Sequence, residues 1–431
     1  MKLLKLITAS LFSITVLCSC DFEERLSWSP DGKRMAVLAD QLRLADEDSI
    51  SKPLLKKQFG SVLAFRWLPD SHHALLAYRR YQHHLTKSGT KPGTKTGAKA
   101  ETSVDYLQLF DFNGDINTVK ATAGPVLYQS SDAIDDLRLS PNGKLAAISQ
   151  ADKGRHKISI VTLSGEVKVV ARNASRPEWS KDSRSIYFFR EISPKDSAHA
   201  NFMPVSTICN LPVADAAGLP VVSKLRYDLA QCAGDVFSGG RIHALADGSL
   251  LFSSTPVKLP ACGVMLGAQE RALFRYRPVS RGCKAAVEQI ILDVALASDL
   301  DSLEPNQDGT KLAICSAKGG VWVVSLSSEE SRGRVTVLEK PLPDSTEISR
   351  TGSFGCAPRW RNANQLSFSV RNLDNAKDLT DNSGHSNVGE VVLQDLQDLA
   401  GGKGLPPRQV LSRGWPSGQI DFLKVGNSAK K

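Results

Sequence analysis

A short hairpin pattern recurs along this chain and limits the folds that it can adopt. Its clearest copy is Leu26–Val37, where apolar and polar residues alternate on both sides of a turn, as in strands with one buried face. The turn is Pro30-Asp31-Gly32. Proline presets its own φ, aspartate can bond the backbone two residues on, and glycine can take a positive φ. The pattern predicts two antiparallel strands joined by a tight reversal.

Six further copies of the hairpin follow, so the chain contains seven. Asp31 and Asp70 lie about forty residues apart, as do Asn142 and Asp182, which is the length of one four-stranded propeller blade. We therefore expect an all-β fold, a single β-propeller of seven four-stranded blades. The further copies are Phe65–Ser71, Leu137–Ile148, Glu178–Phe189, His243–Phe252, Glu304–Ile314 and Arg359–Phe368.

The repeat spacing also predicts the boundaries along the chain. Residues 1–19 are expected to form a lipoprotein signal peptide, 20–416 the propeller, and 417–431 a tail that is a candidate ring-closing strand. A basic insertion, 86–103, is expected to hang from the second blade, with lysine at every fourth position among glycines that prevent a helix. Blades are predicted near 26–60, 62–124, 134–172, 175–230, 235–294, 299–342 and 353–414.

The hairpin resembles the repeat of TolB-like, WD-type β-propellers. The resemblance rests on the turn at Trp28–Gly32 and on a later strand that ends in Asp-x-x-Gly at Asp111–Gly114. It implies the fold but no single function, because such blades occur in transport-complex subunits, peptidase domains and sugar lyases. TolB-type proteins carry an α/β domain before the propeller, whereas here the first blade is expected directly after the signal.

The amino terminus reads as a bacterial lipoprotein signal. Two lysines precede an apolar run that is too short to span a bilayer comfortably, and the run ends in Leu17-Cys18-Ser19-Cys20. We expect lipid on Cys20, since the bulky Leu17 disfavours cleavage before Cys18. Plain secretion is the alternative. The signal predicts a bacterial envelope location, tethered to a membrane on the periplasmic side.

Charge and motifs exclude several kinds of function. Removing the signal leaves a net charge of about +7, which is modest for the length and predicts no nucleic-acid binding. His72-His73 and His83-His84 should lie at opposite ends of a strand, so they predict no metal site. The sequence has no Gly-x-Ser-x-Gly nucleophile motif and no phosphate-binding loop. We therefore assign no catalytic residue, metal or cofactor.

Six cysteines lie in the second half of an exported chain, which favours disulfides. Blade topology predicts Cys315 with Cys356 and Cys209 with Cys232, and it leaves Cys262 with Cys283 as the remaining pair. Buried, reduced thiols are the alternative.

Aspartates gather where the chain is expected to enter several blades. Blade-to-blade connections share one face of a propeller, so these side chains should surround one mouth of the channel. Uncompensated like charges are costly, so the mouth is a candidate site for a cationic group of a partner. The alternative is that they only start strands or cap turns. The residues are Asp132, Asp135, Asp136, Asp235, Asp299 and Asp301.

The sequence thus predicts a lipid-anchored envelope propeller that acts as a monomeric, non-catalytic binding or scaffold protein. Its expected partner is an envelope protein or a cell-wall component. The alternative function is that of a propeller-type polysaccharide lyase or glycan hydrolase.

Overall fold

The computed structural model describes seventeen stretches of the chain, and every regular element in them is a β-strand. No helix in the described stretches is long and apolar enough to cross a membrane. The stretches are 26–38, 42–55, 59–83, 101–152, 155–191, 205–213, 231–237, 241–254, 256–258, 272–277, 286–292, 300–316, 320–326, 332–339, 358–371, 389–397 and 407–413.

The described strands form seven sheets. The first sheet contains β1 (Leu26–Trp28), β2 (Met35–Leu38) and β3 (Leu42–Ala45). The second contains β4 (Ser61–Trp67), β5 (His73–His83), β6 (Glu101–Asn113) and β7 (Lys120–Ser130). The third contains β8 (Ala133–Leu139), β9 (Leu145–Asp152), β10 (Arg155–Thr162) and β11 (Val167–Arg172).

The later sheets are more elaborate. The fourth contains β12 (Ala174–Trp179), β13 (Ser185–Glu191), β14 (Val205–Pro212), β15 (Gln231–Phe237) and β18 (Pro256–Lys258). The fifth contains β16 (Ile242–Ala244), β17 (Leu250–Ser254), β19 (Ala272–Arg277) and β20 (Ala286–Gln289). The sixth contains β22 (Leu300–Pro305), β23 (Lys311–Ser316), β24 (Val321–Leu326), β25 (Arg332–Glu339) and β21 (Ile291–Leu292). The seventh contains β26 (Arg359–Trp360), β27 (Gln365–Arg371), β28 (Gly389–Asp395) and β29 (Gln409–Arg413).

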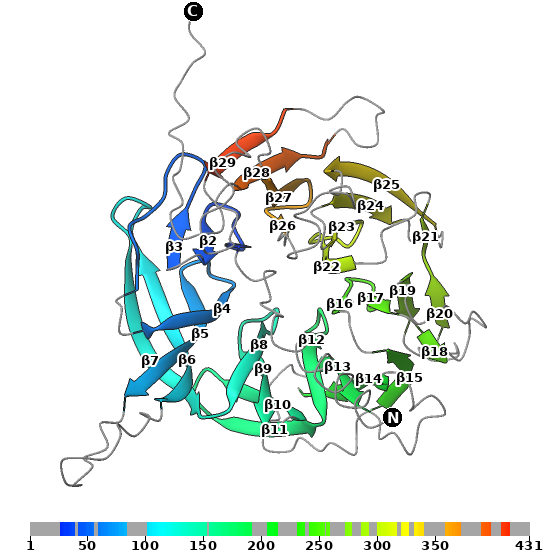
Figure 1. Ribbon diagram of the computed structural model, residues 1–431, viewed down its shortest axis with the longest axis horizontal. Coiled ribbons are helices and arrows are strands. Elements are labelled where there is room, and N and C mark those ends of the chain that lie inside the picture. The colour runs from blue at the N-terminus through cyan, green and yellow to red at the C-terminus, as the bar shows by residue number, and fades with distance from the viewer. Residues whose placement is uncertain are drawn as a thin grey trace, which may run out of the picture.

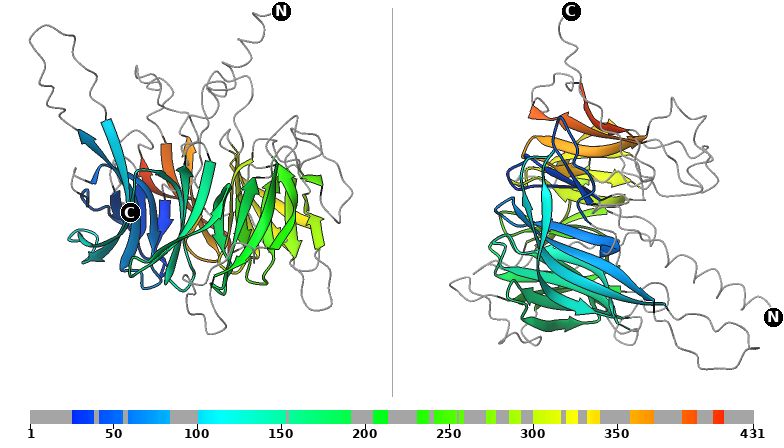
Figure 2. Two further views of the ribbon diagram at one scale, coloured as in Figure 1. Left: turned by 90° about the horizontal axis from the view of Figure 1, so that it is seen from below. Right: turned by 90° about the vertical axis from the view of Figure 1, so that its left-hand side faces the viewer.

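The sheets stand around a common axis, with the first strand of each nearest the centre (Figure 1). These inner strands contact one another in the closed order β1, β4, β8, β12, β16, β22, β26 and back to β1. Figure 2 shows the ring from the side, with strands running between its two faces. The predicted all-β propeller is confirmed.

The hairpins owe their shape to the residues of their turns. In the first hairpin Leu26 pairs with Val37 and Trp28 with Met35, so the alternating apolar residues share one side. Gly32 closes the turn at a φ of 68°, a conformation that side chains with a Cβ rarely adopt. Its amide donates to the carbonyl of Ser29, which completes the reversal.

The core lies between neighbouring sheets rather than inside any one of them. Phe65 and Trp67 of the second sheet pack with Ala36 and Leu44 of the first in one buried cluster. On its other face the first sheet packs against the seventh, where one cluster joins Val391, Leu393 and Leu411 to Leu26, Trp28, Met35, Val37 and Ala45. Each sheet therefore buries apolar surface on both of its faces. This burial stabilises the ring.

Two strands depart from the predicted arrangement. Pro256–Lys258 falls within the predicted fifth blade, 235–294, but it forms β18 and pairs with β15 at the edge of the fourth sheet. Ile291–Leu292 pairs in parallel with β25 of the sixth sheet. Gln231–Phe237 is the fourth strand of the fourth sheet, so that sheet extends past the predicted end at residue 230.

Candidate functional site

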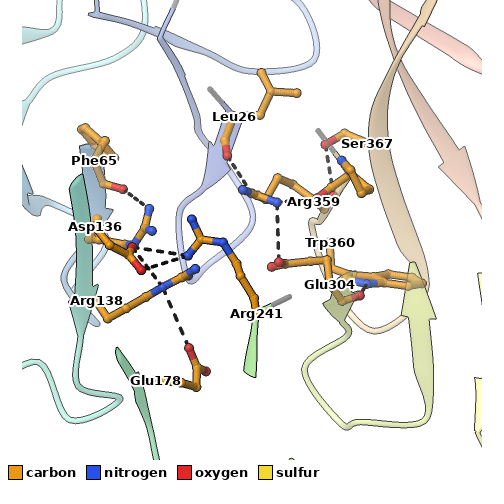
Figure 3. Close-up of polar contacts among 12 residues, drawn as sticks. Leu26, Phe65, Asp136, Arg138, Glu178, Arg241, Glu304, Arg359, Trp360 and Ser367 are labelled. Carbon is orange, nitrogen blue, oxygen red and sulfur yellow. Dashed lines mark hydrogen bonds and ion pairs between the residues drawn. The ribbon is translucent and has the colours of Figure 1, made fainter. Parts of the chain in front are cut away.

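One position in every inner strand carries a polar or charged side chain, and at four of these positions the side chains contact each other between inner strands (Figure 3). The position directly precedes the tryptophan position of each hairpin, and successive side chains in a strand point to opposite faces. The register supports the equivalence, because Ser27 pairs with Ala36, Arg66 with Leu75 and Arg138 with Ala147. We call this set the channel ring. It comprises Ser27, Arg66, Arg138, Glu178, His243, Glu304 and Arg359.

The channel ring is electrically divided. The seventh, first, second and third sheets, which are neighbours, contribute three arginines and Ser27. The fourth, fifth and sixth sheets contribute Glu178, His243 and Glu304. We call these the arginine arc and the glutamate arc. They face one another across the channel, because the inner strands contact in ring order.

The two arcs are paired where they meet. Arg138 Nε lies 3.9 Å from Glu178 Oε2, and Arg359 Nη1 lies 3.5 Å from Glu304 Oε2. Both pairs are drawn in Figure 3. The four side chains are between 15% and 29% exposed, so water still reaches the ring.

Another ion pair lies beside the ring. Arg241 Nη1 lies 3.3 Å and 3.1 Å from Oδ1 and Oδ2 of Asp136 (Figure 3). Asp136 lies in β8, and Arg241 directly precedes β16. Asp136 Oδ1 is also 3.5 Å from Arg138 Nε. Asp136 and Arg241 are 5% and 8% exposed, so both are largely shielded from water, and we call this pair the floor.

The surroundings shift the pKa values of two ring residues strongly. Burial raises the pKa of Glu178 to about 8; Lys181 opposes this shift, while Glu304 and Asp136 add to it. Burial lowers the pKa of His243 to about 3, and the positive charge of Arg241 adds to that shift. Both side chains are therefore neutral at pH 7. His243 Nε2 is buried and has no hydrogen-bond partner among the described residues.

Tryptophans of the hairpin repeat hold the inner strands in place. Trp67 Nε1 donates to Ser27 O at 3.0 Å, Trp179 Nε1 to Arg138 O at 3.0 Å, and Trp360 Nε1 to Glu304 O at 2.7 Å. In each case the acceptor is the backbone of a ring residue in the preceding sheet. These bonds fix neighbouring sheets to each other at the height of the ring.

Bulges set the register of four inner strands just before the ring. The pairing shifts between Val62 and Ala64, between Ile134 and Asp136, and between Leu300 and Ser302. A fourth shift lies between Ser175 and Glu178, where Arg176 has a φ of 54°. Bulges bend a strand and re-aim its side chains, and they are frequent near functional sites.

The structure supplies partners for three of the predicted mouth aspartates from within the chain. Lys157 Nζ lies 2.5 Å from Asp132, and His156 Nδ1 lies 2.7 Å from Asp135. Asp136 is the acid of the floor. The sequence predicted that a partner supplies the cations that compensate these carboxylates. For these three residues, the chain itself supplies them.

Of the other mouth aspartates, the structure describes the strand position of Asp235 and Asp301 only. Asp235 lies in β15, the fourth strand out from the channel, opposite Thr207. This corrects the prediction that it precedes the fifth blade beside the channel. Asp301 lies in the bulge of β22, but its side chain, like all of Asp299, is outside the described residues.

The structure describes only some of the cysteines that were predicted to form disulfides. Cys209 is buried in β14, and its position in the strand is directly opposite that of Cys232 in β15. Cys315 is buried in β23 and is disulfide-bonded. The pairings stay predictions. Cys20, Cys262, Cys283, Cys356 and the basic insertion from residue 86 to 100 also lie outside the described residues.

The histidine pairs occupy different ends of β5. His73 Nδ1 lies 2.7 Å from Asp70 Oδ2 in the turn before the strand, and His83 ends the strand. His84 lies outside the described residues. The described residues contain no group of three or more His, Cys, Asp or Glu side chains that could hold a metal ion.

Sequence reasoning missed the channel ring. Its signal was present, because the ring residue immediately precedes the tryptophan in four of the seven hairpin copies. Its mixed composition gave no familiar motif. Only the closed order of the inner strands shows that the three arginines are neighbours.

No protein-family model and no curated protein matches this chain. Among solved structures it is similar to TolB from Acinetobacter baumannii, with a TM-score of 0.41 and 13% identity over 86% of this chain and 75% of that one. It is similar to a putative TolB from Agrobacterium tumefaciens, with a TM-score of 0.38 and 18% identity over 64% and 80% of the two chains. An oligogalacturonate lyase in complex with manganese has a TM-score of 0.43 and 12% identity over 70% and 77%.

Proposed function

We propose that this protein is a non-catalytic binding or scaffold protein of the bacterial envelope, and that it recognises its partner at the channel ring. The observation that carries the proposal is the ring itself. Six of its seven members have side chains able to carry charge, each from a different sheet. Rigid positioning lowers the cost of binding, because little order remains to be imposed on the site.

The location rests on the sequence. Leu17-Cys18-Ser19-Cys20 after a basic and apolar leader supports lipid attachment at Cys20, and hence a periplasmic-side membrane tether. The modest net charge supports a protein or cell-wall partner rather than a nucleic acid. Asp299 and Asp301 remain candidate partner contacts at the mouth opposite the hairpin turns.

Lipid attachment has a direct test. Cys20→Ala should abolish incorporation of a labelled fatty acid and should release the protein from the membrane fraction, whereas Cys18→Ala should change neither. An unmodified amino terminus beyond Cys20 in the native protein would contradict the assignment.

Partner recognition can be tested in the producing cell with a matched pair of variants. Arg66→Gln removes one charge from the ring, and Arg155→Gln removes one from an exposed position at the start of β10. We expect Arg66→Gln to lower the yield of chemically cross-linked partner at least about tenfold, and Arg155→Gln to leave it unchanged. Equal yields from two folded variants would refute recognition at the ring.

One observation favours the alternative, a polysaccharide lyase or glycan hydrolase. Glu178 holds its proton at neutral pH, with Glu304 near enough to raise its pKa, and a protonated carboxyl is what a general acid requires. Release of unsaturated or reducing sugar ends from envelope polysaccharide, lost in Glu178→Gln, would support the enzyme instead.

A further inference from the structure

The division of the channel ring into two arcs restricts the charge of its ligand. A simple anion would be attracted by the arginine arc but repelled by Glu304, and a simple cation would be repelled by Arg66 and Arg359. A ligand with separated charges satisfies both arcs at once. Complementary charge placement gives specificity chiefly by penalising ligands of the wrong pattern.

A second observation points to the glutamate arc as a place where a ligand donates hydrogen bonds. His243 lies between Glu178 and Glu304 in ring order and is 5% exposed. Its Nε2 has no hydrogen-bond partner among the described residues. An unsatisfied buried polar atom costs free energy. In the neutral ring with the proton on Nδ1, Nε2 is an acceptor that a bound ammonium group can fill.

We propose that the channel ring binds a zwitterionic ligand, with its ammonium group on the glutamate arc and its carboxylate on the arginine arc. The proposal rests on the function proposed above, since it names the chemistry of the ligand at the same ring. The ammonium donates to His243 Nε2 and to Glu178 and Glu304. The carboxylate accepts from Arg66 and from its neighbours on that arc, where guanidinium groups match carboxylate geometry.

The floor is less accessible to water than the ring. The Asp136–Arg241 pair is 5% and 8% exposed, whereas the paired ring residues keep 15% to 29% of their side-chain surface. The floor residues lie two positions before the ring residues Arg138 and His243. The ring residues are therefore the part of this charged cluster that a ligand reaches.

Binding of the ammonium group should release a proton. Glu178 is protonated at pH 7, and a cation beside it favours its ionised form. Affinity for the zwitterion should therefore increase between pH 6 and pH 8, while a ligand without the ammonium should show no such linkage. The charged groups that act on Glu178 are Asp136 and Arg138 of β8, Lys181 of the following turn and Glu304 of β22. His243 of β16 follows Glu178 in ring order, and Arg241 directly precedes β16 and acts on His243.

The test uses three probes that differ only in charge: 6-aminohexanoate, hexanoate and hexylamine. Calorimetry with the full chain in two buffers of different ionisation enthalpy measures both affinity and proton release. We expect 6-aminohexanoate to bind at least about tenfold more tightly than either analogue and to release up to one proton at pH 7. Shorter and longer ω-amino acids then report the span of the site.

Variants test which arc binds the ammonium group and which binds the carboxylate. Glu178→Gln should abolish proton release and lower the affinity for 6-aminohexanoate without changing that for hexanoate, and Arg66→Gln should lower the affinity for both. Glu339→Gln, far from the ring in β25, is the control. Equal binding of all three probes, or binding of none, would overturn the inference. If partner capture still depended on Arg66, the proposed function would survive that result.

Discussion

Ser71 and Ser183 occupy the turn position that glycine holds in four other hairpins, and they adopt its conformation. Their φ is 61°, against 68° to 79° at Gly32, Gly143, Gly248 and Gly309. A residue with a Cβ is strained there. Each hydroxyl offers a compensation, because Asp31 N donates to Ser71 Oγ at 3.1 Å and Asn142 N to Ser183 Oγ at 3.0 Å. Serine thus links its turn to the turn of the preceding sheet.

Two substitutions separate the strain at residue 183 from its hydrogen bond. Ser183→Ala keeps the positive φ and removes the acceptor of Asn142 N, so we expect it to lower the free energy of unfolding by about 1 kcal/mol. Ser183→Gly also loses the bond but relieves a comparable strain, so it should be nearly neutral. Urea denaturation measures both. A glycine variant less stable than the alanine variant would contradict this explanation.

The shifted pKa of Glu178 predicts a pH dependence of stability. Unfolded Glu178 ionises near 4.5 and the folded residue near 8, so between these values the folded state holds one proton more and stability falls as pH rises. His243 is neutral in the folded state, and its unfolded form still loses a proton just above pH 6.5, but this contribution is the same in wild type and in Glu178→Gln and cancels from their comparison. From pH 6.5 to 9, Glu178→Gln should remove a decline of about 1–2 kcal/mol. Equal slopes for wild type and variant in urea titrations would refute it.

At the level of the strand, the sequence predicts what local chemistry determines. The hairpins were predictable because proline, aspartate and glycine act within four residues, as the pairing of Leu26 with Val37 confirms. β18 and β21 were not, since each is two or three residues long and pairs with a different sheet. The ion-pair partners of Asp132 and Asp135 were not predictable either, because local chemistry does not determine them. The lysine and the histidine lie 25 and 21 residues further along the chain.

The tryptophan bonds between inner strands give the clearest prediction at this scale. Trp179→Phe removes the donor to Arg138 O and leaves a buried carbonyl unpaired, which should cost about 1–3 kcal/mol. Trp322→Phe loses the same volume in β24 of the sixth sheet, which does not adjoin β8 or β12. Amide exchange should accelerate in β8 and β12 for Trp179→Phe and not for Trp322→Phe. Acceleration of the same strands by both variants would indicate a general packing effect instead.

For the whole molecule, the decisive step is the closure of the ring between residues more than 300 positions apart. In the described residues no strand is shared between the first and seventh sheets; they meet through packing and side-chain bonds. Trp28 Nε1 donates to Ser367 Oγ at 2.9 Å, and Arg359 Nε donates to Leu26 O at 3.1 Å. Joining distant parts of a chain costs entropy, so this seam has to supply its own stabilisation.

Arg361 makes three of the contacts across this seam. Its Nε donates to Gly32 O at 2.8 Å, its guanidinium lies 5.1 Å from the ring centroid of Trp28, and it forms an ion pair with Glu47. We expect Arg361→Ala to lower the free energy of unfolding by about 1–3 kcal/mol, since it removes charge-assisted bonds and a cation–π contact together.

The seam lies between the first and seventh sheets, so Arg361→Ala should destabilise these two sheets before the others. Amide exchange should accelerate first in β1 to β3 and β26 to β29, because opening the seam exposes the strands on either side of it before those of the third and fourth sheets. Arg155→Ala, at an exposed position in β10, should change neither stability nor exchange. A uniform acceleration in all seven sheets would mean that the ring opens as one cooperative unit, and the first and seventh sheets would then not form a separable seam.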